Sequence, residues 1–303
     1  MTKPQISIIL PTNQRLKFLK RAINSVMSQS YTNWEIVVIN NKNCKNTKNY
    51  IKSLNSQKIR IFPIINNGIL AKSKNLGIKK SRGEWIAFLD DDDTWYPDKL
   101  KICLQRAQKE KCDFIHHPLH IDSEKKSFFK KIFFMSDVQI KKPVYFNLIY
   151  NGNIIAQSSV FVKKKLLIDV KMLPIKKKNF GWEDYFTWLK CSKKTEKFYL
   201  VNEVLGTCWV GESAISSLSV LMTNYKNFKK EFKYKIYNSF GYNVDNLWWV
   251  AYNSAIYFFK KKNYKMAYQK IKKIYPAPFK IKIRVFIIKI IYFLNYLGKG
   301  KIF

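Results

Sequence analysis

One stretch of this chain, Gly83 to Trp95, joins an apolar segment to four consecutive aspartates, Asp90 to Asp93. Neighbouring carboxylates repel one another, so a folded chain tolerates them best when a cation or a cationic loop lies between them. The cluster stands out because the chain has 20 acidic residues against 56 Lys and Arg. The apolar residues before it are typical of a buried strand, and Pro97 favours the start of a helix. We therefore favour a site for a divalent metal and nucleotide phosphates over a solvated acidic turn.

Short apolar runs alternate with helical patterns through residues 1–115. Because parallel strands need crossover connections, this order predicts an α/β fold with a Rossmann-like, mostly parallel central sheet and helices on both faces. The expected strands are Ile6–Leu10, Glu35–Ile39, Lys58–Phe62 and Glu84–Leu89. In such sheets, ligands bind where the carboxyl ends of the strands meet. That edge would gather Pro11, Thr12, Asn13, Asn40, Asn41 and Asp90 to Asp93.

The pattern changes in residues 116–218, where strands are expected at Ile154–Val162 and Lys197–Val201. Between them a helix should begin near Glu183 and Asp184. Acidic groups at that position are explained equally well by the positive end of the helix dipole and by catalysis. Residues 219–303 form a third region, which we expect to be basic, aromatic and mainly helical.

The excess positive charge is concentrated near the C-terminus. Residues 246–303 hold 13 Lys or Arg and no acidic residue, within a chain of net charge +36. Basic residues interrupt the apolar runs between Ile281 and Leu297, so no membrane span of ~20 residues is available. A helix lying in the headgroup region of an anionic leaflet fits this pattern. We rank the membrane surface first, a helical cap with a solvated face second and nucleic acid third.

The five cysteines are scattered with no Cys-x-x-Cys pair. This spacing argues against a structural zinc site and a disulfide framework, and it indicates a reducing compartment. The apolar run between Met1 and Leu10 is too short for a secretory signal, so we expect a cytoplasmic protein.

Five sequence blocks in residues 7–100 stand in the order of a known family. They are Ser7-Ile8-Ile9-Leu10-Pro11-Thr12, Arg21 to Tyr31, Asn75-x-Gly77, Gly83 to Asp93 and Trp95-x-Pro97-x-Lys99-Leu100. These blocks resemble the family-2 glycosyltransferases with the GT-A fold. A weaker similarity covers Gly181 to Leu189, and none is evident after Ser219.

The resemblance implies an inverting enzyme that transfers a hexose from a UDP-sugar to an acceptor hydroxyl with the help of Mn²⁺ or Mg²⁺. Residues 1–115 would bind the nucleotide sugar and residues 116–218 the acceptor. The implied acceptor is a glycan or glycolipid of the bacterial surface, such as lipooligosaccharide, O-antigen or capsule. We choose galactose as the sugar, with N-acetylhexosamine or glucose as alternatives. The basic region would hold the enzyme peripherally on the inner face of the plasma membrane.

The resemblance also implies roles for single residues. Asp90 would contact the ribose and Asp92 would ligate the metal, with the aspartates beside them as supports. A hard, oxygen-ligated cation stabilises the charge of a departing diphosphate. Asp184 would be the general base, worth ~10²- to 10⁴-fold, and Glu183 would orient the acceptor. Further contacts to the nucleotide sugar would come from Pro11, Thr12, Asn13, Asn41, Lys74, Asn75 and Asp91.

Two positions depart from the family's pattern. The chain has Asn40-Asn41-Lys42-Asn43 where the family usually has Asp-Asp-Gly-Ser. The amide oxygen of Asn41 can still accept a hydrogen bond from the nucleotide base, so we expect nucleotide binding to survive this change. Lys74 replaces a common arginine and would meet a phosphate as a point charge.

Two other functions stay open. A nucleotidyltransferase acting on sugar phosphates also places paired aspartates after a strand, but no Gly-rich signature loop follows the first strand here. A non-enzymatic basic protein would bind membranes or nucleic acid, the latter with strong salt dependence. His116, His117 and His120 lack a further ligand at zinc spacing, and we expect them in a polar loop near the acceptor cleft.

Overall fold

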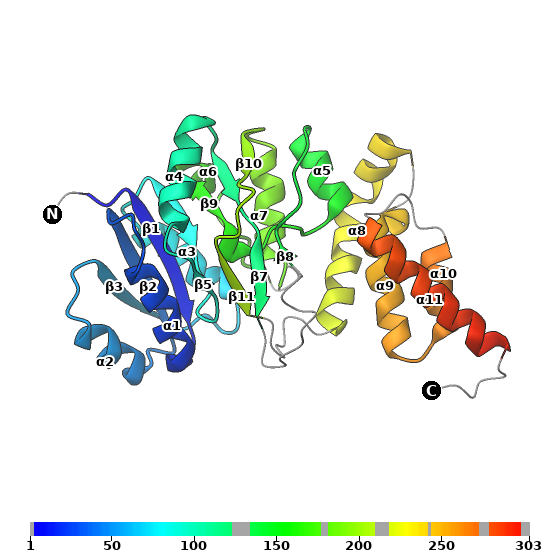
Figure 1. The fold of residues 1–303 in the computed structure, drawn as a ribbon, viewed down its shortest axis with the longest axis horizontal. Helices are drawn as coiled ribbons and strands as arrows, with labels where there is room; N and C mark the ends of the chain where they lie inside the picture. Colours follow the sequence, from blue (N-terminus) through cyan, green and yellow to red (C-terminus); the bar gives the residue numbers. More distant parts are fainter. Residues whose placement is uncertain are drawn as a thin grey trace. The chain divides into compact units, whose positions relative to one another are not determined.

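The computed structural model describes residues 3–122, 134–176, 181–209, 218–241, 244–272 and 279–297. The chain divides into two compact units. The first comprises Met1–Leu148 with Asn153–Glu212, and the second comprises Ile149–Gly152 with Ser213–Phe303. All strands that the structure describes belong to the first unit, and the second is helical (Figure 1).

The first unit is built on a seven-stranded sheet with the order β10-β6-β9-β4-β1-β2-β3. Neighbouring strands are parallel except where β9 pairs with β4 and β6. The prediction of an α/β fold with a mostly parallel sheet is therefore confirmed. The strands are β1 (Ile6–Thr12), β2 (Trp34–Asn41), β3 (Ile59–Ile64), β4 (Trp85–Phe88), β6 (Phe114–His116), β9 (Phe161–Lys163) and β10 (Phe198–Leu200).

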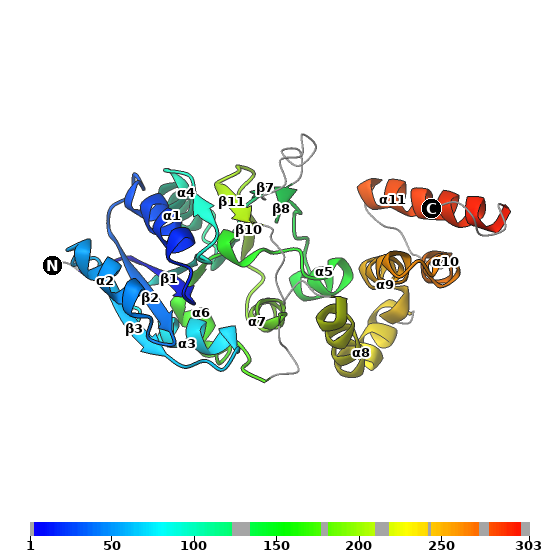
Figure 2. The same cartoon turned by 90° about the horizontal axis from the view of Figure 1, so that it is seen from below.

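Helices cover both faces of this sheet, which explains why β1 and β2 are buried along their whole length. On one face, Ile8 and Leu10 share a core with α1 (Leu16–Met27) and α4 (Lys99–Lys109). Figure 2 shows α3 (Leu70–Lys80) and α6 (Lys164–Asp169) on the other face. There Gly77 approaches Ile9 so closely that a Cβ would lie 2.5 Å from the Ile9 side chain. The central strands are thus held from both sides.

A smaller sheet and several helices complete the first unit. The four-stranded sheet has the order β5-β11-β7-β8. Its strands are β5 (Thr94–Trp95), β7 (Leu119–Asp122), β8 (Phe134–Met135) and β11 (Gly206–Trp209). The helices are α2 (Lys45–Ser53), α5 (Val144–Asn151), whose end belongs to the second unit, and α7 (Glu183–Ser192).

Two local expectations are wrong. The strand expected over Ile154–Val162 forms only at its end, as β9, and a 3-10 turn, Gln157–Ser159, precedes it. The turn forms because the backbone N–H groups of Ser159 and Val160 donate to the carbonyls of Ala156 and Gln157 and not to a neighbouring strand. His116 and His117 do not lie in a polar loop. Both are fully buried at the end of β6, and burial lowers the pKa of His116 to about 4.

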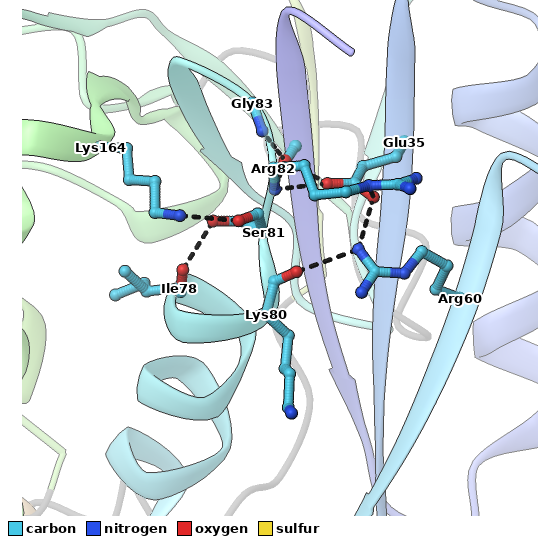
Figure 3. Close-up of polar contacts among 9 residues, drawn as sticks. Glu35, Arg60, Ile78, Lys80, Ser81, Arg82, Gly83 and Lys164 are labelled. Carbon is cyan, nitrogen blue, oxygen red and sulfur yellow. Dashed lines mark hydrogen bonds and ion pairs between the residues drawn. The ribbon is translucent and has the colours of Figure 1, made fainter. Parts of the chain in front are cut away.

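A buried carboxylate ties together the amino ends of the central strands (Figure 3). Glu35 is 1% exposed and accepts hydrogen bonds from Ser7 Oγ (2.7 Å), Arg60 Nη1 (2.9 Å) and both the backbone N and Nε of Arg82 (2.7 and 3.0 Å). Burial alone would raise the pKa of Glu35, but the hydrogen bonds from Arg60, Ser7 and Arg82 outweigh it and hold the pKa below its ordinary value. Gly83 adjoins this network, where a Cβ would lie 2.7 Å from the Ser7 backbone N.

The second unit contains α8 (Leu218–Phe240), α9 (Trp248–Lys260), α10 (Tyr264–Lys272) and α11 (Phe279–Leu297). Trp249 packs its ring 5.1 Å from that of Phe228 on α8. Another core joins α9, α10 and α11 through Ala255, Ala267, Ile271, Val285 and Ile288. Within the described part of the chain, no helix combines the length and the apolar character that crossing a bilayer requires.

Candidate active site

The polar residues predicted to share one edge of the sheet do so. Thr12 ends β1, Asn41 ends β2 and Asp90 follows β4. Because β1 lies between β2 and β4 and is parallel to both, these three ends are neighbours at the carboxyl edge. This is the position at which open α/β sheets bind their ligands.

Asp91 connects the acidic loop to the end of β1 and the start of α1. Its carboxylate is 2% exposed, accepts a hydrogen bond from Thr12 Oγ1 (2.7 Å) and pairs with the guanidinium of Arg15. Burial raises the pKa of Asp91, and the charge of Arg15 opposes this shift. Asp91 therefore holds the loop in place, and its own oxygens face protein groups.

Asp90 and Asp92 are more open, with side chains 32% and 21% exposed. Lys74 Nζ lies 3.0 Å from Asp90 Oδ1 and also donates to Gln157. Arg15 Nη1 lies 2.8 Å from Asp92 Oδ2. Burial raises the pKa of Asp92, and the neighbouring charge of Asp90 raises it further. Two partly exposed carboxylates thus stand beside two cationic side chains.

Negative charge exceeds positive charge in this cluster even without Asp93, since Asp90, Asp91 and Asp92 meet Arg15 and Lys74. Burial raises the pKa of Asp93 to about 8, with the charge of Asp90 as the next contribution. Among the described residues, no group of three or more His, Cys, Asp or Glu is placed to hold a metal ion. Mg²⁺ and similar ions need no such group where one or two carboxylates, substrate phosphates and water complete the shell. The open oxygens of Asp90 and Asp92 fit an ion of that kind.

Ser158 is a support that sequence reasoning missed. Its hydroxyl accepts a hydrogen bond from the Asp90 backbone N (3.1 Å), and its carbonyl accepts one from Trp95 Nε1 (2.8 Å). On the far side of the loop, the Trp209 backbone N donates to Asp93 Oδ1 (2.8 Å). No local signal in the sequence marks Ser158, because its role depends on the turn that precedes β9.

Arg15 was also missed, and here a signal existed. It follows the end of β1 by three residues, where a parallel sheet places it opposite the loop after β4. A cation at that position reduces the electrostatic repulsion among the aspartates. Charge complementarity between the two loops could therefore have identified it.

The acidic pair Glu183 and Asp184 opens α7. Asp184 Oδ1 accepts hydrogen bonds from the Tyr185 backbone N (2.7 Å) and from Asn153 Nδ2 (3.3 Å). Burial raises the pKa of Asp184, while the charge of Lys74 opposes the shift. Burial likewise raises the pKa of Glu183 to about 7. The electrostatic influence of Lys74 on both carboxylates places the start of α7 near the acidic loop.

Four predicted nucleotide-sugar contacts remain: two lie at the end of β1, and two are asparagines whose side chains bind the backbone of this chain. Pro11 is buried within β1, and Asn13 is exposed just beyond it. Asn41 is buried, and its Oδ1 already accepts a hydrogen bond from the Asn66 backbone N (3.1 Å). Asn75 Nδ2 donates to the Leu173 carbonyl (2.8 Å), and the Leu173 backbone N donates to Asn75 Oδ1 (3.0 Å). Asn75 therefore anchors the segment that follows α6.

Comparison with known proteins points to one family. A family model described as glycosyl transferase family 2 matches residues 7–170. TuaG of Bacillus subtilis, whose name assigns it to teichuronic acid biosynthesis, is 23% identical over 71% of this chain and 82% of its own length. Other curated glycosyltransferases match over 16% to 84% of their own length; WcaA of Escherichia coli, for example, is 37% identical over 35% of this chain and 39% of its own length.

Solved structures share the fold. TarS of S. aureus in complex with UDP-GlcNAc superposes with a TM-score of 0.63 at 16% identity, covering 91% of this chain and 82% of that one. The mannosyltransferase PcManGT of Pyrobaculum calidifontis, in complex with GDP-Man and Mn²⁺, gives 0.59 at 12% identity, covering 99% and 89%. At these identities the likeness concerns the fold alone.

Proposed function

The chain belongs to glycosyl transferase family 2, and from this membership we propose that it transfers a hexose from a UDP-sugar to a hydroxyl of a bacterial surface glycan, with inversion at the anomeric carbon. One observation carries the proposal. Two partly open carboxylates lie at the carboxyl edge of the sheet, Asp90 beside Lys74 and Asp92 beside Arg15, and the acidic start of α7 lies near them.

On the donor side, Asp92 would hold Mn²⁺ or Mg²⁺ and Asp90 would contact the ribose. When bound, the ion neutralises charge that develops on the departing diphosphate. Lys74 adds a point charge for the same phosphates, and its contact with Asp90 keeps it there in the absence of substrate. Thr12 and Asp91 keep the loop in register, so that Asp92 stays aligned for the ion.

On the acceptor side, Asp184 would take the proton from the attacking hydroxyl. Its hydrogen bonds from Tyr185 and Asn153 fix the carboxylate at the start of α7. The raised pKa, caused by burial, makes Asp184 a stronger base than an exposed aspartate. Glu183, whose burial raises its pKa to about 7, would orient the acceptor. Residues 1–115 would thus serve the donor, and residues 116–218 the acceptor.

The cellular setting follows from the relatives and from the charge. The name of TuaG supports a surface glycan as acceptor, and the UDP-GlcNAc complex of TarS supports a UDP-sugar as donor. Galactose stays our choice of sugar. Residues 219–303 would keep the enzyme at the cytoplasmic face of an anionic membrane, where lipid-linked acceptors are extended. Family membership favours glycosyl transfer over nucleotidyl transfer and over a purely basic binding protein.

The proposal is tested with a panel of UDP-galactose, UDP-glucose, UDP-GlcNAc and GDP-mannose, each with and without Mn²⁺. Release of the nucleoside diphosphate is measured with lipid-linked glycans from the source bacterium as acceptor. We expect Mn²⁺-dependent release of UDP from one UDP-sugar and growth of the glycan by one hexose. Formation of a nucleotide sugar from a nucleoside triphosphate and a sugar phosphate would instead indicate a nucleotidyltransferase.

A further inference from the structure

Helix α11 buries one apolar face and exposes another. Val285 and Ile288 lie in the core that α11 shares with α9 and α10, and Figure 2 shows the three helices packed together. Of the eleven exposed large hydrophobic side chains in the described residues, four fall within 286–293. Exposure is therefore concentrated on this helix, as expected of an interaction surface. These four residues, the α11 stripe, are Phe286, Ile287, Ile290 and Phe293.

The α11 stripe is prominent and carries lysines along one edge. Phe286 is 63% exposed and Phe293 is 59% exposed, so both rings reach into solvent. Lys282 and Lys289 are exposed and lie four residues before and three residues after Phe286, which places them on the same side of the helix. Lysine can lay its methylene groups along an apolar surface and keep its ammonium group among polar neighbours.

We propose that the α11 stripe docks on the surface of an anionic lipid bilayer, with α11 lying in the headgroup region. The inference rests on the proposed function and deepens it, because it names the surface through which the enzyme reaches a membrane-bound acceptor. A helix with large apolar side chains beside lysines is the pattern of interfacial helices. Charge complementarity supports the choice, since residues 246–303 carry 13 Lys or Arg and no acid.

A second copy of this chain would fit the α11 stripe less well than an anionic membrane does. Symmetric pairing of two α11 stripes would bring Lys282 and Lys289 of one copy close to the same lysines of the other. No acidic residue in 246–303 could neutralise them. The phosphates of an anionic leaflet supply the missing charge, and the acyl boundary accepts the phenylalanine rings.

Sedimentation of the full chain with vesicles tests the docking. Vesicles of phosphatidylcholine are compared with vesicles that also contain phosphatidylglycerol. We expect strong binding only to the anionic vesicles. The double variant Phe286→Gln/Phe293→Gln should bind them on the order of 100-fold more weakly, since it removes both rings. The matched control Ile65→Gln/Ile175→Gln removes two exposed apolar side chains elsewhere and should bind as wild type does.

A second pair of variants separates local from overall charge. Lys282→Gln/Lys289→Gln should weaken binding to anionic vesicles roughly 30-fold, because each lysine acts next to the lipid surface. Lys101→Gln/Lys109→Gln removes the same charge from exposed positions on α4 and should have little effect. Equal effects of the two pairs would show that net charge, rather than the α11 stripe, governs binding.

The outcomes distinguish the docking surface from the proposed function. Wild-type binding by Phe286→Gln/Phe293→Gln would overturn the docking, as would the absence of a preference for anionic vesicles. If the same double variant lost a self-association that the wild type shows in the ultracentrifuge, and its vesicle binding did not change, the α11 stripe would be a contact between two copies of the chain. Thermal shifts with UDP and Mn²⁺, measured on the same samples, report on the active site alone. A missing shift with intact vesicle binding would count only against the proposed function.

Discussion

Carboxylates lie at both ends of the central parallel strands, at the amino ends and at the carboxyl ends. Their surroundings shift the pKa in opposite directions. At the amino ends, hydrogen bonds from Arg60, Ser7 and Arg82 overcome the effect of burial and hold the pKa of Glu35 below its ordinary value. At the carboxyl ends, burial and the charge of Asp90 raise the pKa of Asp92, and Arg15 only partly offsets them. The first carboxylate has all the partners it needs, whereas the second set still lacks positive charge.

This difference separates a structural site from a functional one. A buried carboxylate that is fully hydrogen-bonded stabilises the fold, and its removal leaves its partners unsatisfied. Carboxylates gathered with too few cations disfavour the folded state until a ligand supplies the charge, which is typical of functional sites. Mutations at the two edges should therefore change different properties, and the following predictions test that separation.

The largest effect is expected from Asp184→Asn, at the start of α7. Loss of the general base should lower the transfer rate by about 10²- to 10⁴-fold, with the melting temperature unchanged. Initial rates of UDP release measure the effect. The control Asp169→Asn changes an exposed carboxylate on α6 that pairs with Lys165, and it should keep wild-type activity. A fully active Asp184→Asn enzyme would remove this residue from the mechanism.

Asp92→Asn should lower the transfer rate by about 10²- to 10³-fold, because the charge of the leaving diphosphate loses its metal partner. Stability should hold or rise, since one of the repelling carboxylates is neutralised. Activity as a function of Mn²⁺ concentration and thermal melts give the two readouts. A clear fall in melting temperature would place Asp92 with Glu35 among the structural carboxylates and break the comparison.

Glu35→Gln should produce the reverse pattern. The free energy of unfolding should fall by about 1 to 3 kcal/mol, because Arg60 and Arg82 lose a charged partner but can still reach water. Affinity for UDP with Mn²⁺ should stay the same. Urea denaturation measures the first quantity and calorimetry the second. Glu84→Gln changes an exposed carboxylate two residues after Arg82; it is the matched control and should leave stability unchanged.

The contribution of Glu35 should also depend on pH in a defined direction. Its folded pKa lies below the ordinary value of 4.5, so the folded state favours the ionised form. The stabilisation is fully present above the unfolded pKa and is lost as pH falls through the lower, folded pKa. The stability difference between wild type and Glu35→Gln should therefore be constant near neutral pH and shrink in acid. A difference that grew in acid would reverse the assignment.

The smallest effect is a shift of the pH profile. Asp184 acts as a base only when ionised, so kcat/KM should fall as pH drops through its raised pKa. The charge of Lys74 opposes this shift and favours the ionised form of Asp184. Lys74→Gln should therefore move the acid limb of the profile to higher pH, whatever it does to the maximal rate. A limb that stayed in place would show that Lys74 and Asp184 do not share one site.

Local patterns were sufficient for the central strands and for the acidic loop. Apolar runs that end before Pro11, Asn40 or Asp90 mark the strand ends to within two residues, and the parallel order brings those ends together. They were insufficient for Ser158, because its position depends on β9 running antiparallel between β4 and β6. They were also insufficient for Asn75, whose amide anchors Leu173, 98 residues away in the chain.

The central claim is that the carboxylates after β4 capture a divalent ion together with a nucleoside diphosphate. Calorimetric titration of UDP into the full chain, with and without Mn²⁺, tests it most directly. We predict Mn²⁺-dependent binding by the wild type and by Glu35→Gln, and none by Asp92→Asn. Equal binding of UDP with and without Mn²⁺, or intact binding by Asp92→Asn, would contradict the claim.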